Sequence, residues 1–197
     1  MERCQGKTVA VVGCGTSAVG KGLGALIDSC DIVVRANRAY ITQGISADYG
    51  TRTDILVIGN LHCLWSTIPT DASFEVYPAG LGWWEARDAH VKAWYKLTDR
   101  VGSRWRRPDR HLWDTSWTHS QRPLAGTAAA VMAAMHKPSA MHLIGLDCYS
   151  DSADHAKPNR FKSAFDGHIN MPPAAHDVGV DRKALETLPC DNVTWHR

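Results

Sequence analysis

The stretch that decides the fold of this protein is KTVAVVGCGTS, residues 7–17. Residues 7–12 form a nearly continuous apolar run, which is typical of a buried strand in a parallel sheet. The glycine-rich turn of residues 13–17 follows directly, and we expect a helix over residues 17–29. A strand that passes through such a turn into a helix predicts an α/β domain whose helix N-terminus offers backbone N–H groups to a phosphate.

Further apolar runs extend this pattern along the chain. We expect strands over residues 31–35, 54–58, 74–77, 140–144 and 192–195, and helices over residues 91–98, 126–135 and 180–187. This order predicts a Rossmann-like, doubly wound, mostly parallel sheet in a single domain that spans residues 1–197. Ligands of such sheets bind beyond the carboxyl ends of the strands, so the polar residues after each apolar run are the candidate site.

Two segments differ in composition from the rest. Residues 82–121 form an insertion rich in tryptophan and arginine. Its aromatic residues have three interpretations: core packing, stacking against a sugar, or peripheral contact with a membrane or a lipid-linked sugar. Residues 150–175 are polar and contain prolines, which predicts a mobile lid loop.

The composition limits the class of protein. The chain has 197 residues, 44% of them hydrophobic, and a formal net charge of +2, which fits a globular domain and argues against a general nucleic-acid binder. We expect neither a membrane span nor a signal peptide. The six scattered cysteines argue against a cysteine-based metal site, and we expect reduced thiols. These features predict a protein of the cytoplasm or of a membrane surface, or of the Golgi lumen only if an N-terminal anchor was removed. The oligomeric state is open.

The glycine-rich turn fits more than one nucleotide-binding pattern. Gly13, Gly15 and Ala18 match GxGxxA of dinucleotide-binding proteins, but no carboxylate ends the next strand to bind the ribose of NAD. Arg35 at that position suits the 2′-phosphate of NADP. Residues 15–22 nearly match a Walker A loop, although glycine stands where that pattern requires Ser or Thr. A turn that binds nothing is a further alternative.

Three blocks of the sequence, in order, resemble the sialyltransferases. The first contains VAVVGCGTS, IDS, DIVVRANRA and DYGTRT within residues 9–53, and resembles the long sialyl motif of the animal-type enzymes. The second, residues 124–147 from LAGT to HLIGLD, resembles their short sialyl motif. The third, HDVGVDRKALE at residues 176–186, resembles the catalytic-histidine segment of bacterial sialyltransferases.

The resemblance implies an inverting, metal-independent glycosyltransferase with a GT-A-like sialyltransferase variant of the Rossmann-like fold. Such an enzyme moves sialic acid, or a related nonulosonic acid such as Kdo, from a CMP-sugar donor to a hydroxyl of a glycan or glycolipid acceptor, and needs no cofactor. The implied catalytic residues are His176, as the base, and Tyr149, as a stabiliser of the leaving phosphate. The implied donor-binding residues are Gly13, Gly15, Thr16, Ser17, Asn37, Asn60, Ala125, Gly126, Thr127 and Asp147.

A histidine base suits this reaction, because a neutral imidazole with a pKa near about 6.5 can accept the acceptor's hydroxyl proton at neutral pH. The chain departs from the family at Cys14, where Asn is common, at Ala125, where Ser or Thr is common, and in lacking a second tyrosine after Tyr149. Two alternatives therefore stay open. One is an NAD(P)-binding Rossmann oxidoreductase, and the other is a degenerate module that binds CMP or a glycan without turnover.

Two arginines of the first block have a simpler interpretation than donor contact. Arg35 and Arg52 lie close in sequence to Asp31, Asp48 and Asp54. We expect the two arginines to form structural ion pairs with these aspartates.

Overall fold

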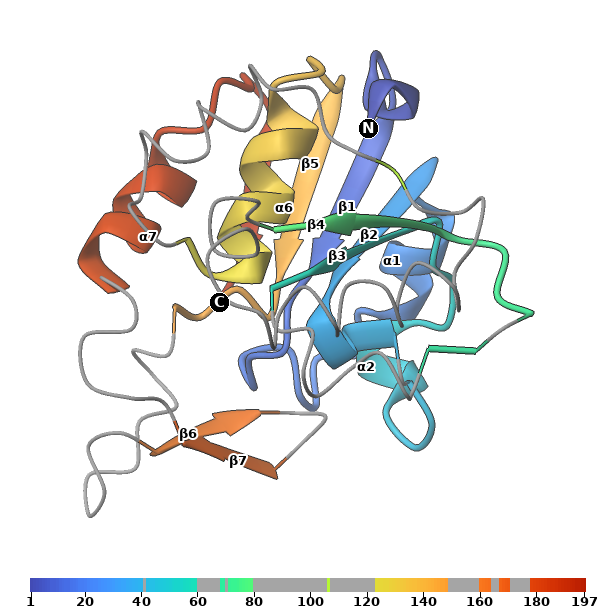
Figure 1. Cartoon of the computed structure of the whole chain (residues 1–197), viewed down its shortest axis with the longest axis vertical. Coiled ribbons are helices and arrows are strands. Elements are labelled where there is room, and N and C mark those ends of the chain that lie inside the picture. Colours follow the sequence, from blue (N-terminus) through green and yellow to red (C-terminus); the bar gives the residue numbers. More distant parts are fainter. Residues whose placement is uncertain are drawn as a thin grey trace, which may run out of the picture.

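One parallel sheet forms the centre of the molecule (Figure 1). The computed structural model describes residues 1–40, 42–59, 68–69, 71–79, 106, 123–148, 160–163, 167–170 and 178–197. The sheet strands are β1 (Thr8–Val12), β2 (Ile32–Ala36), β3 (Ile55–Ile58), β4 (Glu75–Pro78), β5 (Ala140–Ile144) and β8 (Val193–His196). Their order is β4-β3-β2-β1-β5-β8, and all neighbouring pairs are parallel.

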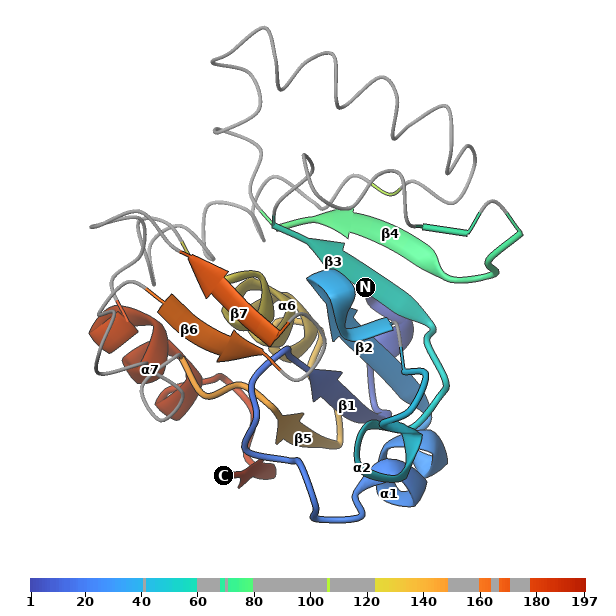
Figure 2. The ribbon, with the colours of Figure 1, turned by 90° about the horizontal axis from the view of Figure 1, so that it is seen from below.

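Helices cover both faces of this sheet (Figures 1 and 2). The helices of the described residues are α1 (Gly24–Ser29), α2 (Ser46–Tyr49), α6 (Ala125–Ala134) and α7 (Val178–Glu186), and 3-10 turns cover Glu2–Cys4 and Asn37–Tyr40. α6 and α7 pack on one face, while α1 and α2 pack on the other. The predicted Rossmann-like, doubly wound α/β fold is therefore confirmed.

The alternation of side chains along β1 explains why the strand is apolar throughout. Val9 and Val11 belong to the core beneath α6, whereas Ala10 and Val12 belong to the core beneath α1. All four side chains have no exposed surface. A strand covered on both faces has no polar side, so its sequence reads as a continuous apolar run.

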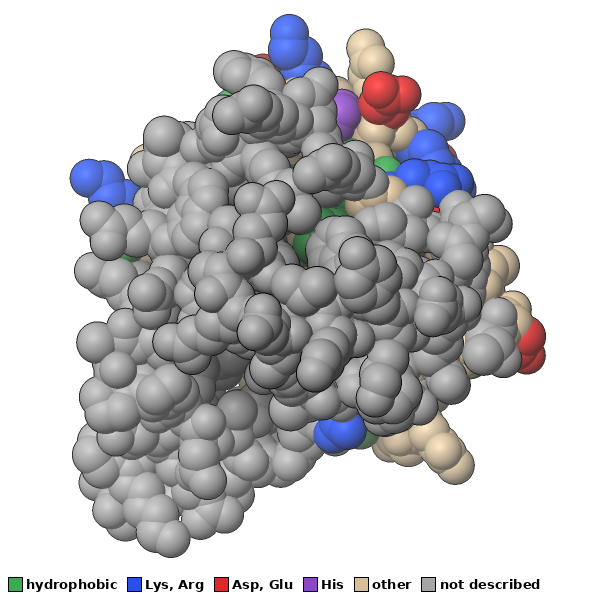
Figure 3. Space-filling model, viewed as in Figure 1, with side chains coloured by type: hydrophobic (Ala, Val, Ile, Leu, Met, Phe, Trp, Pro, Cys, Tyr) green, Lys and Arg blue, Asp and Glu red, His purple; other side chains and the backbone are tan. Residues whose placement is uncertain are grey.

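Few large apolar side chains reach the surface of the described residues. On the face seen in Figure 3, the charged side chains of the described residues lie at the edge of the molecule. Val19, which is 54% exposed, is the exposed large apolar side chain among the described residues. None of the described helices combines the length and apolar character that a membrane span requires.

The predicted start of the helix over residues 17–29 is wrong, because α1 begins only at Gly24. Gly20 and Gly22, which precede it, have φ angles of 77° and 65°, outside the helical region. The Asp48 carboxylate accepts their N–H groups at 2.7 and 2.8 Å, and these hydrogen bonds lower the pKa of Asp48. This contact with a residue 26 to 28 positions away holds the segment as a turn.

The other expected strands and helices lie within two residues of the observed ones, where the structure describes them. The candidate helix over 91–98 lies outside the described residues, as does the insertion over 82–121 apart from Arg106. Within the predicted lid over 150–175, two short strands, β6 (Arg160–Ser163) and β7 (Gly167–Asn170), pair antiparallel. The sequence analysis expected no strands there, and the remainder of the lid is outside the described residues.

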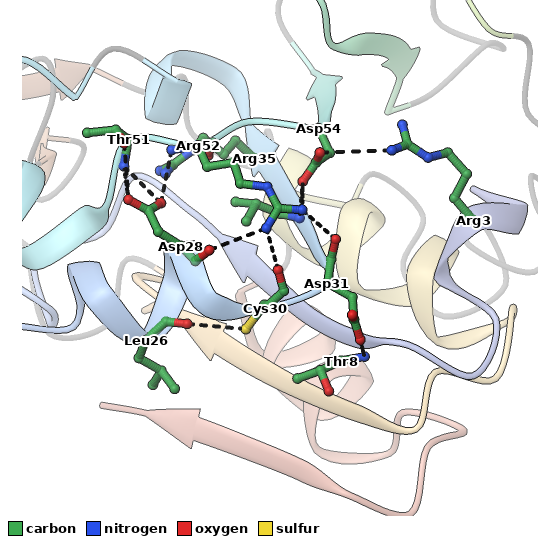
Figure 4. A network of polar contacts seen from close by, with 11 residues as sticks. Arg3, Thr8, Leu26, Asp28, Cys30, Asp31, Arg35, Thr51, Arg52 and Asp54 are labelled. Atoms are coloured by element: carbon green, nitrogen blue, oxygen red, sulfur yellow. Dashed lines mark hydrogen bonds and ion pairs between the residues drawn. The ribbon is translucent and has the colours of Figure 1, made fainter.

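A polar network joins α1 to the segment before β3 (Figure 4). Arg52 lies 2.9 Å from the Asp54 carboxylate and donates to the Cys30 carbonyl at 2.6 Å. Asp28 accepts the N–H groups of Thr51 and Arg52 at 2.9 to 3.0 Å. The structural ion pair expected for Arg52 is confirmed.

The ion pair expected for Arg35 is wrong, since within the described residues it pairs with none of the three aspartates. Arg35 is fully buried in β2 and donates to the backbone carbonyls of Arg52 at 2.8 Å, Ala39 at 3.0 Å and Tyr49 at 2.8 Å. Burial lowers the pKa of Arg35 to about 10, so the guanidinium stays charged at neutral pH. It therefore ties β2 to the 3-10 turn that follows the strand and to residues 49–52, which precede β3.

A pair of histidines links β8, at the edge of the sheet, to β5. His142 Nδ1 and His196 Nε2 lie 3.2 Å apart, so one ring donates to the other when at least one is neutral. Burial lowers the pKa of both histidines, and the charges of His142 and then of Lys21 lower the pKa of His196 further. This arrangement favours the neutral rings in the folded protein.

The histidine pair predicts a loss of stability in acid. Because the unfolded chain holds these protons more tightly, stability is full above about pH 6.5 and declines as the pH falls through the lowered pKa values. We expect His196→Gln to lose less of its thermal midpoint than the parent protein between pH 7.5 and pH 5.5. Equal losses in the two proteins, measured by calorimetric unfolding, would contradict this linkage.

Candidate functional site

A pocket opens where the strand order reverses, between the carboxyl ends of β1 and β5. It is lined by the turn after β1 (residues 13–15), the end of β2 (36–37), the start of α6 (124–127), the loop after β5 (145–148) and Leu185 of α7. This reversal is the place where doubly wound sheets bind ligands. The pocket encloses about 50 Å³, far less than the roughly 300–1,000 Å³ of ordinary ligand sites.

Two loops meet at the floor of this pocket. The Gly13 N–H donates to the Ile144 carbonyl and the Gly15 N–H to the Gly145 carbonyl, both at 2.8 Å. A Cβ atom on Gly15 would overlap the Asp147 carboxylate and lie 2.7 Å from the Gly145 oxygen. Glycine is therefore required at position 15 by the close approach of the loop after β5.

The Asp147 carboxylate links the loop after β5 to the glycine-rich turn by hydrogen bonds. It is only 6% exposed and accepts both the backbone N–H of Ser17, at 3.0 Å, and the Ser17 hydroxyl. Asp147 thus has a structural role in shaping the glycine-rich turn. The donor contact expected for Asp147 and Ser17 stays a prediction.

Tyr49 supports the same turn through its hydroxyl group, a role that the sequence analysis missed. Its hydroxyl donates to the Gly15 carbonyl, and its ring is fully buried. Burial, together with the charge of Asp147, raises the pKa of Tyr49, so the hydroxyl remains a donor. The residue lies within the DYGTRT part of the first block, but only its tertiary contact reveals the role.

The end of β2 is tied to the end of β3 through Asn37. Its φ of 51° is left-handed, and its Oδ1 accepts the Gly59 N–H at 2.8 Å. Asn37 also lines the pocket. Cys14 lies beside it, half-buried, and its thiol donates to the Ala36 carbonyl at 3.4 Å.

The N-terminus of α6 forms the opposite wall. The first hydrogen bond of the helix runs from the Ala128 N–H to the Leu124 carbonyl at 2.9 Å. The N–H groups of Ala125, Gly126 and Thr127 precede that bond, so the helix itself does not use them. Such a helix start attracts an anion, and these three residues line the pocket.

The structure brings most of the predicted donor-binding residues together. The pocket is lined by Gly13, Gly15, Asn37, Ala125, Gly126, Thr127 and Asp147. Thr16 and Ser17 continue the same glycine-rich turn, although they do not line the pocket. His176, Tyr149 and Asn60 lie outside the described residues, so their roles stay predictions.

Cys148 is a pocket residue that the sequence analysis did not select. It has a left-handed φ of 48°, and burial raises the pKa of its thiol to about 12. Among the described residues, the five cysteines form no disulfide. Over the same part of the chain, no group of three or more His, Cys, Asp or Glu side chains is placed to hold a metal ion.

Comparison with known proteins bears on this pocket. Residues 1–68 match the family model of glycosyltransferase family 29 (sialyltransferase). The N-terminal third of the chain is sialyltransferase-like. This match confirms the predicted resemblance to the sialyltransferases. The matched residues include the glycine-rich turn, Asn37 and Tyr49.

The sialyltransferase-like fold extends over the rest of the chain. It is similar to the crystal structure of a mammalian sialyltransferase, with a TM-score of 0.65 and 16% identity over 97% of this chain and 70% of that chain. It is also similar to a mammalian sialyltransferase in complex with Gal-beta-1-3GalNAc-ortho-nitrophenol, with a TM-score of 0.59 and 17% identity over 98% of this chain and 70% of that chain. Comparison with curated proteins gave no match.

Proposed function

We propose that this protein is a sialyltransferase that takes sialic acid, or a related nonulosonic acid such as Kdo, from a CMP-sugar. One observation carries the proposal. The glycine-rich turn of the family-matched segment and the N-terminus of α6 face the same pocket, at the position where doubly wound sheets bind nucleotides. By analogy with the relative crystallised with a disaccharide derivative, the acceptor is a glycan.

Backbone N–H groups supply the stabilisation that the departing CMP requires. The phosphate gains negative charge as its bond to the anomeric carbon breaks. The start of α6 provides N–H donors that are already oriented before the reaction begins, and the glycine-rich turn lines the same pocket. Tyr149, the residue after Cys148 of the pocket, is the proposed side-chain donor to the same phosphate. In this proposal no metal ion or cofactor takes part.

His176 is the proposed base, and it precedes α7 by two residues. The acceptor hydroxyl attacks the anomeric carbon from the face opposite CMP and gives its proton to the imidazole. A glycosidic bond forms, the bond to the CMP phosphate breaks, and the configuration inverts. The imidazolium then returns its proton to solvent.

Two structural observations weaken the oxidoreductase alternative. The sequence left Arg35 open as a ligand for the 2′-phosphate of NADP. In the structure Arg35 is fully buried, and its guanidinium donates hydrogen bonds to three backbone carbonyls. Asn37 ends β2 where an NAD-binding protein would place a carboxylate, and its side-chain oxygen is bound to Gly59. Neither residue is suited to the ribose of a dinucleotide.

The donor pocket is tested by calorimetric titration with CMP, UMP, ADP and NADPH. We expect CMP to bind most tightly, with the same affinity in EDTA as in buffer, because backbone N–H groups rather than a metal hold the phosphate. If the protein bound NADPH but did not bind CMP, the proposal would be overturned in favour of an oxidoreductase.

A His176→Ala variant tests whether the protein is an enzyme or a module that only binds CMP. We expect sialyl transfer from a CMP-sugar to fall by about 10²- to 10⁴-fold, while the dissociation constant for CMP stays unchanged. His136→Ala, which changes a histidine beyond the C-terminal end of α6 that does not line the pocket, is the matched control and should retain transfer. CMP binding without any transfer or donor hydrolysis by the parent protein would indicate the degenerate module instead.

A further inference from the structure

Asp181 is a buried acidic residue to which the proposed chemistry assigns no role. It lies in α7, and its side chain has no exposed surface. Its Oδ1 accepts the backbone N–H of Leu124, the residue that precedes α6, at 3.0 Å. Aspartate is seldom fully buried unless its oxygens are hydrogen-bonded, so this contact across two helices calls for an explanation.

The contact supplies a cap that the sequence of α6 lacks. The N-cap residue is Leu124, whose side chain cannot accept a hydrogen bond, although Ser, Thr, Asp or Asn usually stands there. A helix start leaves four N–H groups without helical partners, here those of residues 124–127. Asp181 takes the first of them. The other three belong to Ala125, Gly126 and Thr127, which line the pocket.

The same helix also reaches the pocket directly. Leu185, one turn after Asp181, is a lining residue, and α6 and α7 pack against one another (Figure 1). His176, the proposed base, precedes Asp181 by five residues. The carboxylate therefore connects the segment that carries the base to the helix start that faces the donor.

We propose that Asp181 is a positioning residue for the CMP-sugar. It holds the start of α6 so that the N–H groups of residues 125–127 point at the donor phosphate. This inference rests on the proposed function. Asp181 touches neither substrate, and its effect passes through the backbone of α6.

The test compares three variants of α7. Asp181→Leu keeps the branched shape of the side chain but removes the acceptor, and we expect the dissociation constant for CMP and the KM for the CMP-sugar to rise about tenfold or more. The KM for the acceptor should stay unchanged, which a general loss of structure would not produce. Asp181→Asn retains Oδ1 and should restore CMP binding to within about threefold of the parent. Glu186→Gln, an exposed change on the same helix, is the control.

A second variant removes the donor of the same hydrogen bond. Leu124 has a φ of −58°, which proline adopts, so Leu124→Pro deletes the N–H while Asp181 remains. It should weaken CMP binding as Asp181→Leu does, and it keeps the test valid if Asp181→Leu does not fold. Folded variants with unchanged CMP affinity would overturn the inference and leave the proposed function standing. A parent protein that binds no CMP would overturn both.

Discussion

A Gly15→Ala variant is expected to lose measurable CMP binding and to be less stable by about 1–3 kcal/mol. The added methyl group would overlap the Asp147 carboxylate and crowd the Gly145 carbonyl, so the two loops must separate. Separation would break the hydrogen bond from the Gly15 N–H to Gly145 and displace Asp147 from Ser17. Urea unfolding and calorimetric titration with CMP would measure the two effects.

Gly20→Ala is the matched control for this substitution. Gly20 belongs to the turn that follows, has a φ of 77°, and has no atom within 4 Å of the position a Cβ would occupy. The change should cost about 1 kcal/mol through its left-handed backbone and leave CMP binding intact. If Gly15→Ala were as mild as Gly20→Ala, the close approach of the two loops would not be what requires glycine at position 15.

An Arg35→Met variant is expected to lose at least about 3 kcal/mol of unfolding free energy, since hydrogen bonds to a charged group are worth about 1.5–3 kcal/mol each. Methionine fills much of the same space, but it leaves three backbone carbonyls without their donors inside the protein. This loss is a large fraction of the about 5–15 kcal/mol that stabilises an ordinary domain. Urea unfolding monitored by circular dichroism would measure the loss.

Two further arginine variants sharpen this prediction. Arg3→Met removes a cation that is 51% exposed and lies 3.9 Å from Asp54, and it should change stability by less than about 1 kcal/mol. Arg35→Lys keeps the charge but cannot span three carbonyls, so its loss should fall between those of the other two variants. A loss for Arg35→Met no larger than that for Arg3→Met would mean that the buried guanidinium does not hold the two loops.

The sheet could be predicted because each central strand carries its own signal. β1 is covered on both faces and reads as a continuous apolar run, and β5 lies exactly where its apolar run predicts it. The start of α1 could not be predicted. Its position depends on the Asp48 carboxylate, whose contact with Gly20 and Gly22 follows only from the folded chain.

The sequence by itself determined the α/β class, the glycine-rich turn and the resemblance to the sialyltransferases, because these depend on local composition and on the order of short motifs. Only the tertiary structure decided the roles of the buried polar groups. Arg35 serves backbone carbonyls rather than an aspartate, Asp147 locks the turn, and Asp181 caps a helix that is distant in sequence. The physical reason is that a buried polar side chain must find its partner among groups that folding brings near, and sequence spacing does not show which groups those are.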